Sequence, residues 1–123
     1  LHAETEIAER LVKLLEDSSP VVRKTACESM LRIGVVCDSA VLLKLLQSDD
    51  REERFLARRV LAMIPEDTWK DEYLSSPSSR LVVQSALTLI TQSPNRSNAS
   101  LVLDSLARLT KNFISDADFV DLL

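Results

Sequence analysis

The chain has 123 residues, a formal net charge of −4 and only 4% aromatic residues. This length corresponds to about one domain with a substantial core, and the aliphatic composition argues against disorder. One glycine and four prolines leave little material for hairpins, so an all-helical fold is predicted. Asp and Glu outnumber Lys and Arg by 19 to 15, which disfavours a generic binder of phosphate backbones.

The first predicted helical pair occupies the beginning of the chain. Its first helix carries an apolar stripe at helical spacing, made by Ile7, Leu11, Leu14 and Leu15. Ser19 and Pro20 follow, a hydroxyl N-cap before a proline suited to the first helical position. The second helix then runs through Arg23–Ile33 and is predicted to end at Gly34, which would adopt a left-handed C-terminal cap.

A second pair repeats this pattern, because the segment Leu42–Ile64 aligns with Leu11–Ile33 without a gap. Its first helix carries the apolar stripe Leu42, Leu45 and Leu46. Asp50 and Glu53 resemble a capping box at the start of the second helix, and Pro65 stops the pair.

The third and fourth units are less regular. A compressed first helix around Trp69 and Tyr73 precedes the third phrase, Arg80–Ile90, whose helix is expected to begin at Ser76-Pro77. A polar loop is predicted over Asn95–Ser100, followed by a helix from about Leu101 through Leu109 toward Phe113. A last helix is expected after the Ser115-Asp116 cap.

The repeated phrase itself predicts the core. Each copy opens with arginine, has a small apolar residue three places later and closes with isoleucine, the spacing of one helix face. Such units are too small to bury their own apolar face and must stack on one another. The residues expected to be buried are Ala26, Met30, Ile33, Ala57, Val60, Leu61, Ile64, Val83, Ala86, Leu87 and Ile90.

The turn Asp17–Ala26 resembles the signature of the HEAT and HEAT-like repeats, an acidic-Pro turn followed by Val-Arg and a small residue. This resemblance covers roughly residues 5–92 and implies a right-handed α-α superhelix of three helical pairs plus a partial fourth. We expect one HEAT-like domain over residues 1–123, with repeats at about 5–34, 38–64, 66–92 and 98–123. Both ends look like cuts from a longer chain, since the sequence begins at Leu1 without a methionine and stops at Leu123 within an apolar phrase.

In this family an aspartate of the turn and the arginine of the second helix commonly form a ladder between repeats. The resemblance assigns that ladder to Asp17 with Arg23, and to Asp49 or Asp50 with Arg54. The third unit departs from it, because the turn before Arg80 contains no acid, so the ladder should be broken there or made by serine.

The resemblance implies a non-catalytic scaffold for protein–protein interaction. A single histidine and a single glycine leave no parts for a His-paired nucleophile, a metal cluster or a phosphate loop, so no enzyme, cofactor or metal is expected. The alternative is a HEAT-fold enzyme, either DNA glycosylase-like, with carboxylates clustered beside Trp69, or bilin lyase-like. Trp69 is also explained as a core residue, and those carboxylates as first-turn charges at a helix.

In HEAT arrays the second helices line the concave side, which implies the binding site. Residues one, four and five places after each repeated arginine should point into that groove. The candidates are Lys24, Glu28, Phe55, Arg58, Arg59, Leu81, Gln84 and Ser85, together with Cys27. The middle set, Phe55 with Arg58 and Arg59, is the strongest candidate, because an aromatic residue flanked by arginines is the composition that dominates interface hot spots. The competing interpretations are a solvated, salt-bridged face for the arginines and packing between repeats for Phe55 and Leu81.

The expected partner is therefore a protein or peptide of unknown identity, and nucleic acid is disfavoured. No segment is long and apolar enough to span a membrane, and a cytoplasmic location is slightly favoured. Association through exposed solenoid ends is expected as well, with a carboxy-terminal face made by Phe113, Phe119, Leu122 and Leu123. Cys27 and Cys37 are too few for a disulfide framework and are interpreted as small, partly buried thiols.

Overall fold

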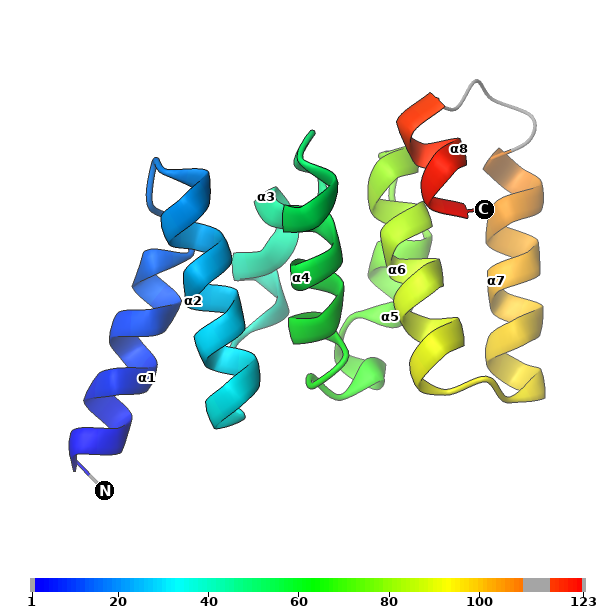
Figure 1. The fold of residues 1–123 in the computed structure, drawn as a ribbon. Helices are drawn as coiled ribbons and strands as arrows, with labels where there is room; N and C mark the ends of the chain where they lie inside the picture. The colour runs from blue at the N-terminus through cyan, green and yellow to red at the C-terminus, as the bar shows by residue number, and fades with distance from the viewer. Residues whose placement is uncertain (1, 110–115, 123) are drawn as a thin grey trace. The chain divides into compact units, whose positions relative to one another are not determined.

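The computed structural model describes residues 2–109 and 116–122, and the regular elements of this part of the chain are all helices (Figure 1). The all-α repeat fold predicted from the sequence is confirmed. In chain order the elements are α1 (His2–Leu14), α2 (Pro20–Ile33), the 3₁₀ turn η1 (Ser39–Leu42), α3 (Leu43–Leu46), α4 (Arg51–Leu61), the 3₁₀ turn η2 (Glu66–Thr68), α5 (Lys70–Leu74), α6 (Ser79–Gln92), α7 (Arg96–Leu109) and α8 (Asp116–Leu122).

The chain forms two compact units, residues 1–64 and residues 65–123. The boundary between Ile64 and Pro65 falls between the second and third predicted repeats. Unit 1 therefore contains two helical pairs, α1 with α2, and η1 and α3 with α4. Unit 2 contains η2 and α5 with α6, followed by α7 and α8.

In unit 1 the second helices α2 and α4 pack against each other, while α1 packs on α2, and α3 packs on α4 (Figure 1). The core between them is aliphatic, with Met30, Leu45 and Leu61 each 0% exposed. Unit 2 is organised around α6, which contacts α5, α7 and α8. Trp69, Tyr73 and Val83 are buried there.

Helix ends in unit 1 follow the predicted capping chemistry. Ser19 caps α2 by accepting a hydrogen bond from the Val22 amide at 3.5 Å, and Pro20 occupies the first position. Gly34 has φ 82°, the left-handed cap expected of it, and its amide donates to the Met30 carbonyl. Asp50 caps α4 by accepting from the amides of Glu52 and Glu53. Asp50 thus supplies its predicted half of the capping box.

Two predicted helix starts in unit 2 were misplaced. The cap of α6 is Ser78 rather than Ser76, whose hydroxyl instead accepts a hydrogen bond from the Ser78 amide at 3.1 Å. The polar stretch predicted as a loop is largely helical, since α7 begins at Arg96. Asn95 explains this start, because its side-chain oxygen accepts from the Asn98 amide at 2.9 Å.

The predicted core is confirmed at Ala26, Met30, Ala57, Val60, Leu61, Ile64, Val83 and Ala86, all of which are buried. Leu87 is only half-buried. The prediction is wrong for Ile33 and Ile90, which are 60% and 36% exposed. Ile33 and Ile90 lie on the last turns of α2 and α6. By contrast, α4 ends at Leu61, and Ile64 lies in the turn that follows, where its amide donates to the Leu61 carbonyl at 3.0 Å and its side chain is buried.

The expected carboxy-terminal face falls on residues that the structure does not describe. Phe113 and Leu123, and the side chains of Phe119 and Leu122, lie outside the described residues. Of the helices in residues 2–109 and 116–122, none combines the length and the apolar character needed to cross a bilayer. The single-domain organisation and the repeat boundaries remain predictions.

Candidate functional site

Arg23 of α2 connects the two second helices of unit 1. Its Nε donates to Glu53 Oε1 at 2.8 Å, its Nη2 to Glu53 Oε2 at 3.2 Å, and its Nη1 to the Asp17 carbonyl at 2.7 Å. The hydrogen bond to Glu53 raises the pKa of Arg23, against the opposing effect of burial. Because Glu53 is only 1% exposed, this two-point ion pair fixes how α2 and α4 are aligned. The residues that follow on both helices are positioned by it.

The ladder implied by the family resemblance needs a correction at Arg23. Asp17 contributes its backbone carbonyl to Arg23, while its carboxylate accepts from the Ser19 amide at 2.8 Å. The carboxylate partner is Glu53 of the next second helix instead. Arg54 makes the same kind of backbone contact as Arg23, because its Nη1 donates to the carbonyl of Ser48, in the turn before α4, at 2.9 Å.

Arg80 pairs in the same way, although the sequence predicted a broken ladder in the third repeat. Its Nε lies 3.0 Å from Asp118 Oδ1, and Asp118 is 2% exposed. Glu53 and Asp118 each occupy the third position of their helix, α4 and α8. The sequence signal that would have found both pairs is an acid in the first turn of the following second helix.

Lys24 is held by carboxylates at the start of α4. Its Nζ lies 2.9 Å from Asp50 Oδ2 and 3.6 Å from Glu52 Oε2. The hydrogen bond between Lys24 and Asp50 raises the pKa of the lysine and lowers that of the aspartate. Lys24 is thereby neutralised locally, in agreement with the interpretation of a salt-bridged face.

Phe55, on the outer side of α4, is an exposed aromatic residue beside two guanidinium groups. Its side chain is 48% exposed. The Cζ atoms of Arg58 and Arg59 lie 5.7 Å and 6.0 Å from the ring centroid, which is within cation–π range. Packing within the chain therefore leaves about half of the ring open to a partner.

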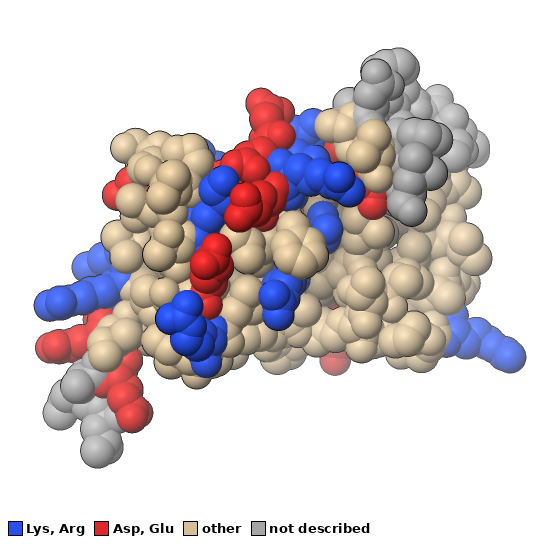
Figure 2. Space-filling model, in the orientation of Figure 1, with Lys and Arg blue, Asp and Glu red and all other residues tan. Residues whose placement is uncertain are grey.

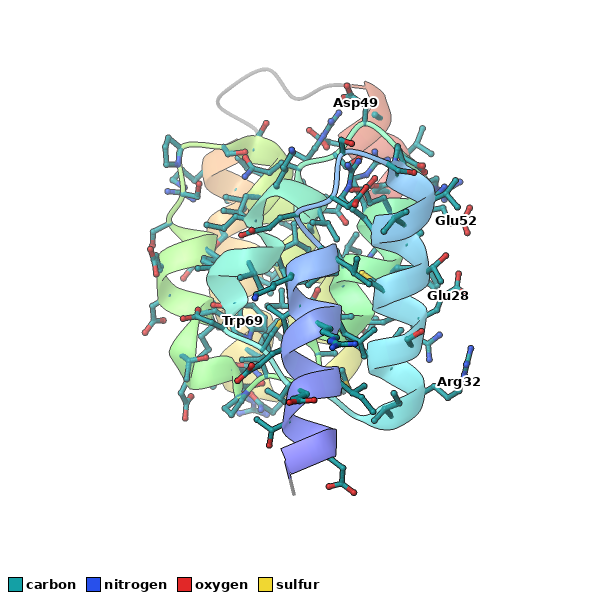
Figure 3. All side chains as sticks on the ribbon, turned by 90° about the vertical axis from the view of Figure 1, so that its left-hand side faces the viewer. Glu28, Arg32, Asp49, Glu52 and Trp69 are labelled. Carbon is teal, nitrogen blue, oxygen red and sulfur yellow. The ribbon has the colours of Figure 1, made fainter. Side chains whose placement is uncertain are left out.

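The surface of unit 1 around α2 and α4 carries both signs of charge (Figure 2). Acidic and basic side chains alternate there, and no continuous positive strip crosses the part of this surface that the view displays. Glu28 and Arg32 on α2 and Glu52 on α4 project outward on the same flank (Figure 3). A surface of mixed charge suits a protein better than a nucleic-acid backbone.

Several predicted groove residues are buried, so their expected exposure is wrong. Cys27, Gln84 and Ser85 are 0% exposed, and Leu81 is 5% exposed. In the third repeat, the residue four places after the arginine faces α8 rather than solvent, since Gln84 Nε2 donates to Asp121 Oδ2 of that helix at 2.7 Å. In unit 2, α6 packs against α5, α7 and α8. The candidates of the third repeat, Leu81, Gln84 and Ser85, therefore have little open surface.

Lys24, Glu28, Phe55, Arg58 and Arg59 are the predicted site residues that retain solvent access. All five lie on α2 and α4 of unit 1. We call them the α2–α4 face.

Trp69, the residue on which the DNA-glycosylase alternative relied, is a core residue. It is 1% exposed, and its ring lies 6.0 Å from that of Tyr73 at an interplanar angle of 34°. A base cannot stack on a ring that is already enclosed. The neighbouring Asp67, Asp71 and Glu72 are exposed, as first-turn carboxylates usually are.

Neither thiol has the properties of a nucleophile. Burial raises the pKa of Cys27 to about 12 and that of Cys37 to about 11, so both are protonated at neutral pH. Among the described residues, no three His, Cys, Asp or Glu side chains come together in a way that could hold a metal ion.

Comparison with known proteins gives one match. A family model described as HEAT repeats matches residues 1–62, which comprise nearly all of unit 1. No curated protein and no solved structure matches the chain.

Proposed function

Because the chain belongs to the HEAT repeat family, we propose that it is a non-catalytic scaffold that binds a protein partner through the α2–α4 face. HEAT repeats generally act in protein–protein interaction. The finer assignment, to this face and to a peptide or protein surface that covers Phe55, is our own. It rests on unit 1, the part of the chain that the family model matches.

The observation that carries the proposal is the exposed ring of Phe55. A phenylalanine side chain can bury about 150–250 Å². With 48% of it exposed, a partner that covers the ring gains about 2 kcal/mol from apolar burial. The adjacent guanidinium groups of Arg58 and Arg59 add hydrogen-bond donors around the same ring. An aromatic anchor beside arginines is the composition enriched in interface hot spots.

The charges of the face favour a protein over a nucleic acid. Lys24 is already paired with Asp50 and Glu52. The whole chain carries a net charge of −4, whereas affinity for nucleic acid grows with the number of phosphates neutralised. A protein partner can instead match both signs of charge and cover the apolar ring.

The test is quantitative affinity purification with the chain as bait. We expect the Phe55→Ala, Arg58→Ala, Arg59→Ala variant to lose partners that wild type retains. A matched control removes exposed apolar and basic side chains elsewhere, as Leu103→Ala with Arg96→Ala on α7, and should retain them. Both variants must keep the wild-type melting temperature. If the folded α4 variant retains every partner, the α2–α4 face is not the binding site.

A further inference from the structure

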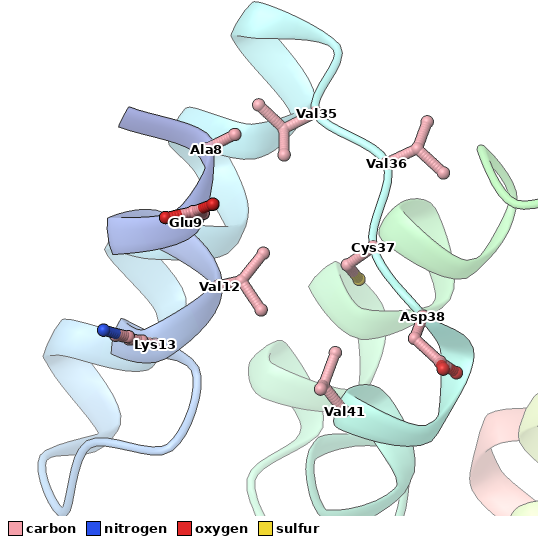
Figure 4. A pocket seen from close by; sticks show the side chains of 9 residues that line it. All are labelled: Ala8, Glu9, Val12, Lys13, Val35, Val36, Cys37, Asp38 and Val41. Carbon is pink, nitrogen blue, oxygen red and sulfur yellow. The ribbon is translucent and has the colours of Figure 1, made fainter. Parts of the chain in front are cut away.

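A second surface of unit 1 lies away from the face described above, between α1 and the segment that leads from α2 into η1. It contains a pocket of about 410 Å³ (Figure 4). Val12 of α1, Cys37 and Val41 point into the space between the two elements. The lining is mostly apolar, and a pocket of this size is larger than one aliphatic side chain needs.

The far wall of the pocket is an extended segment, residues 35–38, which belongs to no helix. Its exposure alternates along the chain, with Val35 and Cys37 half-buried, and Val36 (55% exposed) and Asp38 facing solvent. Asp38 has extended backbone angles, φ −68° and ψ 133°. Alternation with a period of two and β-branched residues are the properties of a β-strand, although no partner strand is present among the described residues.

The backbone of this segment is available for pairing. At its ends, the Val35 amide donates to the Met30 carbonyl at 2.9 Å, and the Asp38 carbonyl accepts from Val41 at 3.2 Å. Between these points, no hydrogen bond within the described part of the chain engages the Val36 amide or the carbonyls of Val35, Val36 and Cys37. In an extended chain the amide and the carbonyl of one residue point to the same side, so the two backbone groups of Val36 form a short strand edge, which can add another strand.

The charges around the pocket are predominantly acidic. Glu9 and Asp38 lie on its lining, with Lys13 as the single basic residue there. On α1 as a whole, the exposed acids Glu4, Glu6 and Glu9 outnumber the exposed bases Arg10 and Lys13. A cationic partner segment is therefore favoured over an anionic one.

We propose that the groove between α1 and residues 35–41 binds an extended, basic peptide segment of a partner protein by β-strand addition. Backbone groups of residues 35–38 pair with the peptide, whose aliphatic side chains at alternate positions enter the pocket. Side chains two residues apart lie on the same face of a strand. Two aliphatic side chains of the peptide, at positions i and i+2, can therefore enter the same pocket of about 410 Å³. A lysine or arginine beside them meets the acidic rim. This site is separate from the α2–α4 face and does not depend on it.

The experiment uses a phage-displayed library of random dodecapeptides, selected against the full chain. Enriched peptides should carry aliphatic residues at alternate positions next to Lys or Arg. Synthetic copies are then titrated by fluorescence polarisation. Val36→Pro removes one backbone donor while proline still allows an extended chain, and it should weaken binding about tenfold. Val12→Trp fills the pocket from the helix side and should weaken binding at least as much.

Two controls make the result specific. Val36→Ala keeps the amide and trims a side chain that is 55% exposed, so affinity should fall far less than in Val36→Pro. The Phe55→Ala, Arg58→Ala, Arg59→Ala variant should also bind normally, which separates failure of this proposal from failure of the proposed function. Bound peptide should slow alkylation of Cys37, followed at alkaline pH because burial raises the pKa of this thiol to about 11, while Cys27 is fully buried and does not interfere.

The proposal is overturned if no peptide is enriched over an unrelated protein, or if enriched peptides bind the Val12→Trp variant as tightly as wild type. Enrichment of acidic peptides without alternating aliphatic residues would contradict it as well. If sedimentation showed instead that wild type dimerises and Val12→Trp does not, the groove would be assigned to self-association. Should Val36→Pro fail to fold, Val12→Trp decides the question.

Discussion

Removing the Glu53 carboxylate should destabilise unit 1 strongly, and Glu53→Ala is the direct test. Glu53 accepts two hydrogen bonds from Arg23, at 2.8 Å and 3.2 Å, in a site where its own side chain is 2% exposed. Breaking a buried ion pair by deleting one partner costs about 3–5 kcal/mol, because the remaining charge stays buried. Arg23 keeps its bond to the Asp17 carbonyl, so we expect the lower end, about 3 kcal/mol.

The measurement is urea unfolding followed by circular dichroism at 222 nm, with thermal melting as a second readout. A loss of about 3 kcal/mol corresponds to a melting temperature lower by about 10 °C for a chain of 123 residues. Glu52→Ala is the matched control, since the Glu52 side chain is 64% exposed and its loss should cost less than about 0.5 kcal/mol.

A double replacement distinguishes the net value of the pair from the cost of leaving one charge alone. Arg23→Met with Glu53→Leu removes both charges and keeps side chains of comparable length, and should recover most of the stability lost in Glu53→Ala. A Glu53→Ala variant that loses less than about 1 kcal/mol would refute the assignment of Glu53 as the buried anchor between α2 and α4.

Three further outcomes are expected. Leu61→Ala should cost about 2–5 kcal/mol in urea unfolding, while Ile33→Ala, at a position 60% exposed, should cost less than about 1; equal losses would contradict the observed burial. Asn98→Ala removes the amide bonds to the Ser93 carbonyl at 2.9 Å and to Glu66 at 3.2 Å, and should lower stability by about 1–3 kcal/mol, measured by fluorescence of Trp69; an unchanged transition would count against this network. The hydrogen bond from Lys24 lowers the pKa of Asp50 below its usual 3.8, so the stability that the ionised Asp50 contributes is present above that pH and is lost as the pH falls through the lowered pKa. Asp50→Asn should therefore reduce the loss of stability at acidic pH in a profile of unfolding free energy against pH. An acidic part of the profile that is the same in the variant and in wild type would refute this dependence on Asp50.

Much of the helical framework could be read from local chemistry. The caps at Ser19, Asp50 and Gly34 depend on side chains or backbone preferences within a few residues, which the sequence states directly. Ser78 and Asn95 were missed because neighbouring Ser and Asn residues offer several equivalent caps, and only packing selects among them.

The candidate site was predicted only in part. Phe55 and Arg59 are exposed as expected, but Gln84 occupies the position of Arg58 in the repeat and is buried against Asp121 of α8. Equivalent positions of the repeat lie on the same face of each second helix. Whether they are exposed depends on which other helices pack against that face. The same reason explains Arg80, whose partner Asp118 is distant in sequence.

The sequence by itself determined the all-α repeat fold, the apolar face of each second helix and most helix ends, because these follow from periodicity and from chemistry within one or two turns. The tertiary structure decided which arginine meets which carboxylate, which of the equivalent surface positions stay open, and that residues 35–38 line a pocket with α1. These features depend on contacts between segments far apart in the chain, and a single sequence does not encode such distances as a local pattern.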